Sequence, residues 1–148
     1  MKKFLQKKLK DQKGMTLIEL LAVIVIIAII AAIAIPAIGN LIENSRVGAM
    51  KSDALNAMSA AELYLADNPT QTSVSAIGDL TGYLDDRGSL TAFTYTPAVG
   101  TTAATMTGTT EVSSIKIVFA AGTTKANITA LPNNTGNATV GTITVSGR

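Results

Sequence analysis

The sequence of 148 residues contains no cysteine, no histidine and no tryptophan. The lack of cysteine excludes a disulfide framework. The lack of cysteine and histidine together excludes thiolate nucleophiles, imidazole-based catalytic triads and the usual zinc and haem ligand sets. Charged residues are scarce, at 15%, whereas hydrophobic residues make up 47%. This balance favours a folded core or a membrane segment over a disordered chain.

Positive charge is concentrated at the start of the chain. Residues 1–14 contain six lysines and one aspartate, a local charge of +5, whereas residues 15–148 contain six basic and nine acidic residues, a charge of −3. The formal charge of +2 and the pI of about 9.0 therefore combine a short basic segment with an acidic remainder. The whole-chain pI suggests a nucleic-acid partner, but this partner becomes uncertain once the basic segment is set aside.

An unbroken apolar run extends from Leu20 to Ile38. As a helix, it would span about 28 Å, which is close to the thickness of the hydrocarbon core of a bilayer. Lysines precede the run and neither lysine nor arginine occurs in residues 39–45, which predicts a cytoplasmic N-terminus and an exported remainder. The run fits a secretory signal peptide, with Ala32–Ile33–Ala34 as a cleavage site, or a plain N-terminal anchor.

Two features suit neither a signal peptide nor a plain anchor. Glu19 places a carboxylate at the edge of the apolar run, which costs about 2–3 kcal/mol at membrane depth and has no use in either kind of segment. In addition, the helical pattern continues after the run, with apolar residues at spacings of three and four. These residues are Val47, Met50, Ala54, Met58, Ala61 and Leu65. Asn68–Pro69 then stops the pattern, so one helix is predicted from about Met15 to Asp67.

From Thr70 onward the composition favours strands and turns. Nineteen of the last 79 residues are threonine, and the segment Thr101–Thr110 contains six of them. The best strand candidates are Ala92–Thr96, Ser114–Ala120 and Thr139–Ser146. We expect three or four antiparallel strands packed on the amphipathic part of the helix, because so small a sheet region needs the helix as the second wall of its core. The predicted fold class is α+β.

The start of the chain carries a specific resemblance. The segment Lys13–Gly14–Met15–Thr16–Leu17–Ile18–Glu19–Leu20–Leu21, between the lysines and the apolar run, resembles the processing site of type IV pilins and pseudopilins. The resemblance covers roughly the first seventy residues. It implies that a prepilin peptidase cuts after Gly14 and that the new terminal residue, Met15, is N-methylated. Most family members have phenylalanine in place of Met15, and methionine preserves its apolar character.

The resemblance also implies roles along the helix. Glu19 would pair with the N-terminal amine of a neighbouring subunit and fix the register of the filament, since opposite charges relieve each other's burial. The alternative is that Glu19 only extends to the lipid headgroups. Pro36 and Gly39 match a segment that bends or partly melts in filaments, or they produce a mild kink near the membrane surface. Close helix packing would use Ala28, Ala31, Ala32 and Ala34.

The predicted organisation is a cleaved leader over residues 1–14, a transmembrane and filament-core helix over residues 15–38, and a globular head over residues 39–148. The head combines the amphipathic helix of residues 39–67 with the β-rich region of residues 70–148. The chain would first lie in the cytoplasmic membrane as a single-pass protein with its N-terminus inside. It would then become part of a cell-surface pilus.

The predicted function is that of the major structural subunit of a type IV pilus. The alternatives are a competence pseudopilin in DNA uptake, a pseudopilin of a protein-secretion system, and a soluble secreted protein, which the leader motif disfavours. The expected partners are further copies of the chain in a helical homopolymer, the prepilin peptidase and N-methyltransferase, a membrane assembly platform, and the membrane before assembly. We find no credible nucleophile–base pair, and therefore predict no enzyme activity and no cofactor or metal.

Four weaker patterns occur in the second half of the chain. The acidic loop Asp79–Gly88 resembles no EF-hand, so a solvated loop is favoured over a calcium site of the kind that major pseudopilins carry. N-x-[ST] sequons begin at Asn127, Asn133 and Asn137, and indicate only a surface loop. The last patterns are a faint basic patch and three aromatic residues for which burial in the core is expected. The patch comprises Lys116, Lys125 and Arg148, and the aromatic residues are Phe93, Tyr95 and Phe119.

Overall fold

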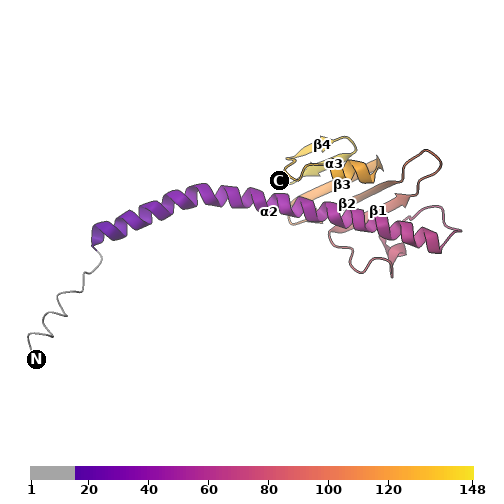
Figure 1. The fold of residues 1–148 in the computed structure, drawn as a ribbon, viewed down its shortest axis with the longest axis horizontal. Coiled ribbons are helices and arrows are strands. Elements are labelled where there is room, and N and C mark those ends of the chain that lie inside the picture. The colour runs from indigo at the N-terminus through magenta and orange to yellow at the C-terminus, as the bar shows by residue number, and fades with distance from the viewer. Residues whose placement is uncertain (1–15) are drawn as a thin grey trace, which may run out of the picture. The chain divides into compact units, whose positions relative to one another are not determined.

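The computed structural model describes residues 16–148 (Figure 1). By their internal contacts these residues divide into two units, with the boundary between Gly39 and Asn40. We call the second unit the head. Helix α2 (Leu17–Asp67) supplies residues to both units. The long N-terminal helix predicted from the sequence is thus confirmed.

Helix α2 ends at the predicted position. Its last residue is Asp67, and the backbone N–H and the side-chain amide of Asn68 both donate to the carbonyl oxygen of Tyr64, at 3.0 and 2.8 Å. Pro69 follows directly and has no N–H with which to extend the helical hydrogen bonds. The asparagine thus satisfies a terminal carbonyl at the point where the proline prevents another turn.

The part of α2 in the first unit has no buried large side chain. Every leucine, isoleucine and valine from Leu17 to Ile38 is at least 48% exposed. By its length and composition this helix is able to cross a membrane. Apolar exposure on all sides of a helix is typical of a segment that lies in lipid or packs against other helices.

The head contains a five-stranded antiparallel sheet with the strand order β1-β2-β3-β5-β4. The strands are β1 (Leu90–Thr96), β2 (Thr105–Val112), β3 (Ile115–Thr123), β4 (Ala138–Val140) and β5 (Ile143–Ser146). Short helices occur before and within the sheet region, at η1 (Ile77–Leu80) and α3 (Lys125–Ala130). The predicted α+β fold class is confirmed.

Several details of the sheet differ from the prediction. Thr139–Ser146 is not one strand but the hairpin of β4 and β5, which turns at Gly141, where φ is 59°. The threonine-rich segment provides strand β2, which the sequence analysis did not assign, so the sheet has five strands rather than three or four. Helix α3 was also missed. It begins after Thr124, whose hydroxyl accepts a hydrogen bond from the Asn127 N–H.

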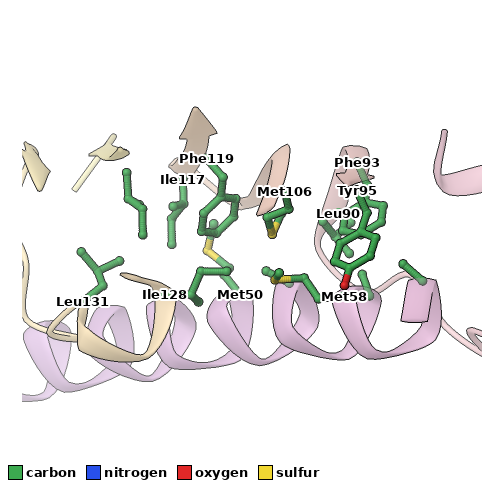
Figure 2. Close-up of a cluster of buried hydrophobic side chains, with 14 of the residues drawn as sticks. Met50, Met58, Leu90, Phe93, Tyr95, Met106, Ile117, Phe119, Ile128 and Leu131 are labelled. Carbon is green, nitrogen blue, oxygen red and sulfur yellow. The ribbon is translucent and has the colours of Figure 1, made fainter. Parts of the chain in front are cut away.

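The core of the head lies between α2 and one face of the sheet. Figure 2 shows Met50 and Met58 on the side of α2 that faces the strands. The predicted apolar stripe on the helix is confirmed, because all of its members are buried except Leu65, which is partly buried. The three aromatic residues of the strands are also buried, as expected. Helix and sheet therefore form one core, and each provides a wall for the other.

Candidate functional site

The first turn of α2 holds the best-defined polar site of the first unit. The carboxylate of Glu19 accepts hydrogen bonds from the backbone N–H and the hydroxyl of Thr16, at 2.7 and 3.0 Å. The Thr16 hydroxyl in turn accepts from the Glu19 N–H at 3.3 Å. This reciprocal pair is a capping box, which satisfies two of the N–H groups that a helix leaves free at its start. The spacing Thr-x-x-Glu carries this signal, which the sequence analysis did not use.

The other predicted site residues of the N-terminal region lie in different settings. Gly14 and Met15, the predicted cleavage and methylation positions, lie outside the described residues. Pro36 and Gly39 both lie within α2, which continues through them. A Cβ atom added at Gly39 would meet nothing within 4 Å. Packing within the described residues therefore does not require glycine at this position, and its effect is to lower the local helix propensity, by about 1 kcal/mol relative to alanine.

The acidic loop Asp79–Gly88 uses two of its carboxylates for local structure. Asp79 accepts hydrogen bonds from the backbone N–H groups of Ser75 and Ala76, at 3.2 and 3.0 Å, and thereby holds the start of η1. Asp86 accepts from the Gly88 N–H at 2.9 Å. Among the described residues no group of three or more acidic side chains is placed to hold a metal ion. These contacts fit a solvated loop whose carboxylates accept hydrogen bonds from nearby backbone N–H groups.

The cations of the predicted basic patch each have a carboxylate opposite them. Lys125 forms an ion pair with Glu62 at 2.9 Å, and Arg148 forms one with Glu43 at 3.3 Å. Lys116 on β3 is the register partner of Glu111 on β2. Binding along a nucleic-acid backbone needs several cations that are free to face phosphates. These pairings therefore disfavour the patch as a nucleic-acid surface.

The three sequons occupy different structures. Asn127 lies in helix α3 and is not part of a loop, so the prediction of a single surface loop is wrong for it. Asn133 and Asn137 do lie in the segment between α3 and β4, and both are exposed. Their side chains contact other parts of the head, because Asn133 accepts from Lys51 and Asn137 donates to the Arg148 carbonyl oxygen.

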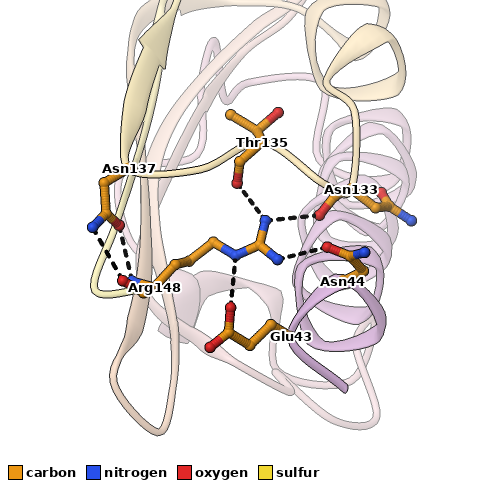
Figure 3. A network of polar contacts seen from close by, with 6 residues as sticks. All are labelled: Glu43, Asn44, Asn133, Thr135, Asn137 and Arg148. Atoms are coloured by element: carbon orange, nitrogen blue, oxygen red, sulfur yellow. Dashed lines mark hydrogen bonds and ion pairs between the residues drawn. The ribbon is translucent and has the colours of Figure 1, made fainter. Parts of the chain in front are cut away.

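A polar network around Arg148 was not predicted from the sequence (Figure 3). Its guanidinium contacts side chains of α2 and carbonyl oxygens of the segment between α3 and β4. Lys51 joins the same segment to α2 through the carbonyl oxygen of Leu131, and burial lowers the pKa of this lysine. The contacts of this network with α2 join groups that are 80 to 105 residues apart in the chain, which is why no local motif indicates them.

The comparison with known protein families supplies the decisive observation for the N-terminal region. Residues 9–35 match the prokaryotic N-terminal methylation motif. The methylation motif includes the predicted cleavage position, the Thr16–Glu19 capping box and most of the apolar run. It is the leader of type IV pilins and pseudopilins, as the sequence analysis expected. No characterised protein and no solved structure matches the chain significantly.

The methylation motif has two consequences for the chain. It implies processing by a prepilin peptidase and assembly of the chain with copies of itself. Together with the exposed apolar part of α2, it fits anchoring in a membrane followed by incorporation into a surface pilus. The motif points to a structural protein rather than an enzyme. It ends at residue 35, so it assigns no role to the head.

Proposed function

We propose that the chain is the major subunit of a type IV pilus. The observation that carries this proposal is the methylation motif at residues 9–35, together with the first part of α2, in which every leucine, isoleucine and valine from Leu17 to Ile38 is exposed. A helix of this kind needs either lipid or neighbouring helices around it. A filament subunit is surrounded first by lipid, while it is anchored in the membrane, and then by neighbouring helices, once it is packed into the polymer.

The proposed maturation begins with cleavage after Gly14 by the prepilin peptidase, followed by N-methylation of Met15. The leader of residues 1–14 would keep the N-terminus in the cytoplasm through its lysines. Residues 15–38 would form the transmembrane and filament-core helix, and residues 39–148 the exported head. The mature subunit would carry a net charge of −3, in place of the +2 of the precursor.

Assembly would bring the apolar helices of many copies together. Glu19 would accept the N-terminal amine of a neighbouring subunit, and this pair would fix the axial register of the polymer. Small residues, among them Ala28, Ala31 and Ala34, would let the helices approach closely. Pro36 and Gly39 would allow the helix to bend or loosen between the filament core and the head. Such a polymer is a helical, head-to-tail assembly.

The decisive experiment is mass spectrometry of the mature protein from the native cell. The proposal expects a terminus at Met15 with one methyl group on its amine. A terminus at Ile35, after Ala32–Ile33–Ala34, would instead indicate a cleaved signal peptide and would overturn the proposal. Long surface fibres that disappear in a deletion strain are expected of a major pilin. Their absence, together with loss of DNA uptake or of protein secretion, would indicate a pseudopilin.

A further inference from the structure

Helix α2 has no core contact in the first turns that belong to the head. The head begins at Asn40, but the first fully buried residue of the helix is Val47. In between, the large apolar side chains of Leu41 and Ile42 are 67% and 47% exposed. Apolar packing therefore holds the helix to the sheet only from Val47 onward, because buried apolar area is the main source of such attachment.

Arg148 supplies the missing attachment through polar contacts. Its Nε donates to Oε2 of Glu43 at 3.3 Å, and its Nη2 donates to Oδ1 of Asn44 at 2.5 Å. The Arg148 side chain is only 8% exposed, whereas that of Glu43 is 37% exposed, so water is largely excluded on the arginine side of the ion pair. Charge-assisted hydrogen bonds of this kind are about twice as strong as neutral ones.

The same guanidinium is fixed on its other side by the segment between α3 and β4. Its Nη1 donates to the carbonyl oxygens of Asn133 and Thr135. The Arg148 backbone is held as well, because its N–H donates to Oδ1 of Asn137 at 2.8 Å and its carbonyl oxygen accepts from Nδ2 of Asn137 at 3.2 Å. Figure 3 shows Arg148 between the helix and this segment. Arg148 thus joins two parts of the chain that are distant in sequence and that no disulfide connects.

We propose that Arg148 is a non-covalent latch that fastens Glu43 and Asn44 of α2 to residues 133–137. The latch moves the start of the firmly held helix from Val47 back to Glu43, about one turn. It does so in a chain without cysteine, in which no disulfide is able to close this region. The guanidinium is suited to the task because its planar fork bonds several acceptors at once, which an ammonium on a flexible stem does not.

The proposal also explains the position of Lys51. This residue donates to the carbonyl oxygen of Leu131 and to Oδ1 of Asn133, two turns further along the helix. Lys51 therefore holds the same segment on the part of α2 that the core already fixes. Loss of Arg148 is expected to free the helix before Val47 while the Lys51 contacts remain.

Hydrogen–deuterium exchange of the full chain in detergent micelles tests the latch without polymerisation. In Arg148→Gln, amides of residues 43–47 and 133–137 should exchange about tenfold faster or more, whereas amides of β1, β2 and β3 stay unchanged. Arg148→Lys should behave like Arg148→Gln, because the planar fork is lost. The double variant Glu43→Gln, Asn44→Ala removes the partners of Arg148 on the helix, and it should also speed the exchange of amides 43–47. The matched control is Lys116→Gln, which removes an exposed cation of β3 and should leave all of these amides as they are.

Two results would overturn the latch. One is unchanged exchange of residues 43–47 in both Arg148→Gln and the double variant. This result would mean that the helix is stable before Val47 without the contacts of Arg148. The other is a uniform rise over the whole head, which would assign Arg148 to global stability rather than to this attachment. Because each measurement uses unassembled protein, the outcome is independent of whether the chain forms a pilus.

Discussion

The phenolic oxygen of Tyr95 donates a hydrogen bond to Oε1 of Glu62 at 3.1 Å. Tyr95 lies on β1 with its ring in the core, and Glu62 lies on α2, so the bond crosses the interface between helix and sheet. Lys125 of α3 donates to the same carboxylate at 3.0 Å. One carboxylate of the helix therefore joins a strand and a second helix at the edge of the core.

The setting of Tyr95 predicts a specific response to alkaline pH. Burial, together with the charge of Glu62, raises the pKa of Tyr95 to about 12, from 10.0 in the unfolded chain. The folded state thus holds this proton more tightly, so its contribution to stability is complete below pH 10 and is lost as the pH rises toward about 12. In an ultraviolet absorbance titration, Tyr95→Phe should remove the last tyrosine step and make the loss of stability above pH 10 less steep.

Tyr83→Phe is the control for this titration. A hydrogen bond to Asp67 raises the pKa of Tyr83 as well, but this tyrosine is only partly buried and packs against the edge of the core. Its removal should leave the step at about pH 12 in place. Persistence of that step in Tyr95→Phe, or its loss in Tyr83→Phe, would contradict the assignment.

A second prediction concerns Asp53 of α2. Its Oδ2 accepts hydrogen bonds from the N–H and the hydroxyl of Ser89, at 2.8 and 2.6 Å, and so ties the helix to the residue before β1. Asp53→Ala should lower the free energy of unfolding by about 2 kcal/mol, because hydrogen bonds to a charged acceptor are lost and the Ser89 N–H loses its partner. Urea unfolding of the full chain in detergent, followed by circular dichroism, measures this change. The exposed neighbour Ser52 provides the control, and an equal effect of Ser52→Ala would contradict the prediction.

The helix and its buried face could be predicted from the sequence because their signals are local. Val47, Met50 and Met58 recur at helical spacing, and Asn68–Pro69 marks the end of the helix in adjacent residues. Tyr95 could be assigned to the core for a similar reason, since Thr94 and Thr96 flank it in an alternating pattern. In each case a residue and its near neighbours contain enough information for the prediction.

The missed elements depend on turns and on distant partners. Strand β2 has Met106 as its only fully buried large apolar residue, and it is held by pairing with β1 and β3 on both sides. The β4–β5 hairpin turns at Gly141, where the spacing of three between Val140 and Ile143 breaks the alternation, and the sequence analysis treated both short strands as one. The contacts of Arg148 with Glu43 join residues more than a hundred positions apart, and no sequence pattern connects them. The capping box of Thr16 and Glu19, in contrast, could have been predicted from the Thr-x-x-Glu spacing, which the sequence analysis did not use.

Two buried threonines provide a third prediction, because the hydroxyl of one has hydrogen-bond partners and the hydroxyl of the other has none among the described residues. The hydroxyl of Thr110 on β2 is fully buried and has no hydrogen-bond partner within residues 16–148. The hydroxyl of Thr123 on β3 is equally buried but donates to the Ala120 carbonyl oxygen at 2.7 Å and lies 2.8 Å from Oγ1 of Thr142. A buried hydroxyl without a partner keeps its cost of desolvation, whereas one with partners recovers it.

The same substitution should therefore have opposite effects at the two positions. Thr110→Val replaces the hydroxyl with a methyl group of similar size and should raise the free energy of unfolding by about 1 kcal/mol. Thr123→Val should lower it by about 1 kcal/mol or more, because the oxygen partners lose a hydrogen bond. Urea midpoints of the two variants give the sign directly. A loss of stability in Thr110→Val would show that its hydroxyl has a partner after all.

The last prediction separates two roles of Glu19. Within the chain its carboxylate accepts from the Thr16 N–H at 2.7 Å, and in the proposed filament it pairs with the amine of a neighbour. Glu19→Gln keeps an oxygen acceptor for the cap but removes the charge, whereas Thr16→Ala removes the hydroxyl of the cap, worth about 1 kcal/mol, and keeps the charge. Both variants should be cut after Gly14, unlike Gly14→Val, which should remain an uncut precursor in the membrane.

Fibre formation then distinguishes the roles. Because an amide does not neutralise a buried amine, Glu19→Gln should produce few or no fibres in electron micrographs of cells. Thr16→Ala should produce fibres in reduced amount, since a weakened cap leaves the ion pair intact. Glu19→Ala should match Glu19→Gln. Wild-type fibres from Glu19→Gln together with their loss in Thr16→Ala would show that the helix cap, rather than the charge, is what assembly requires, and would contradict the role of Glu19 in filament register.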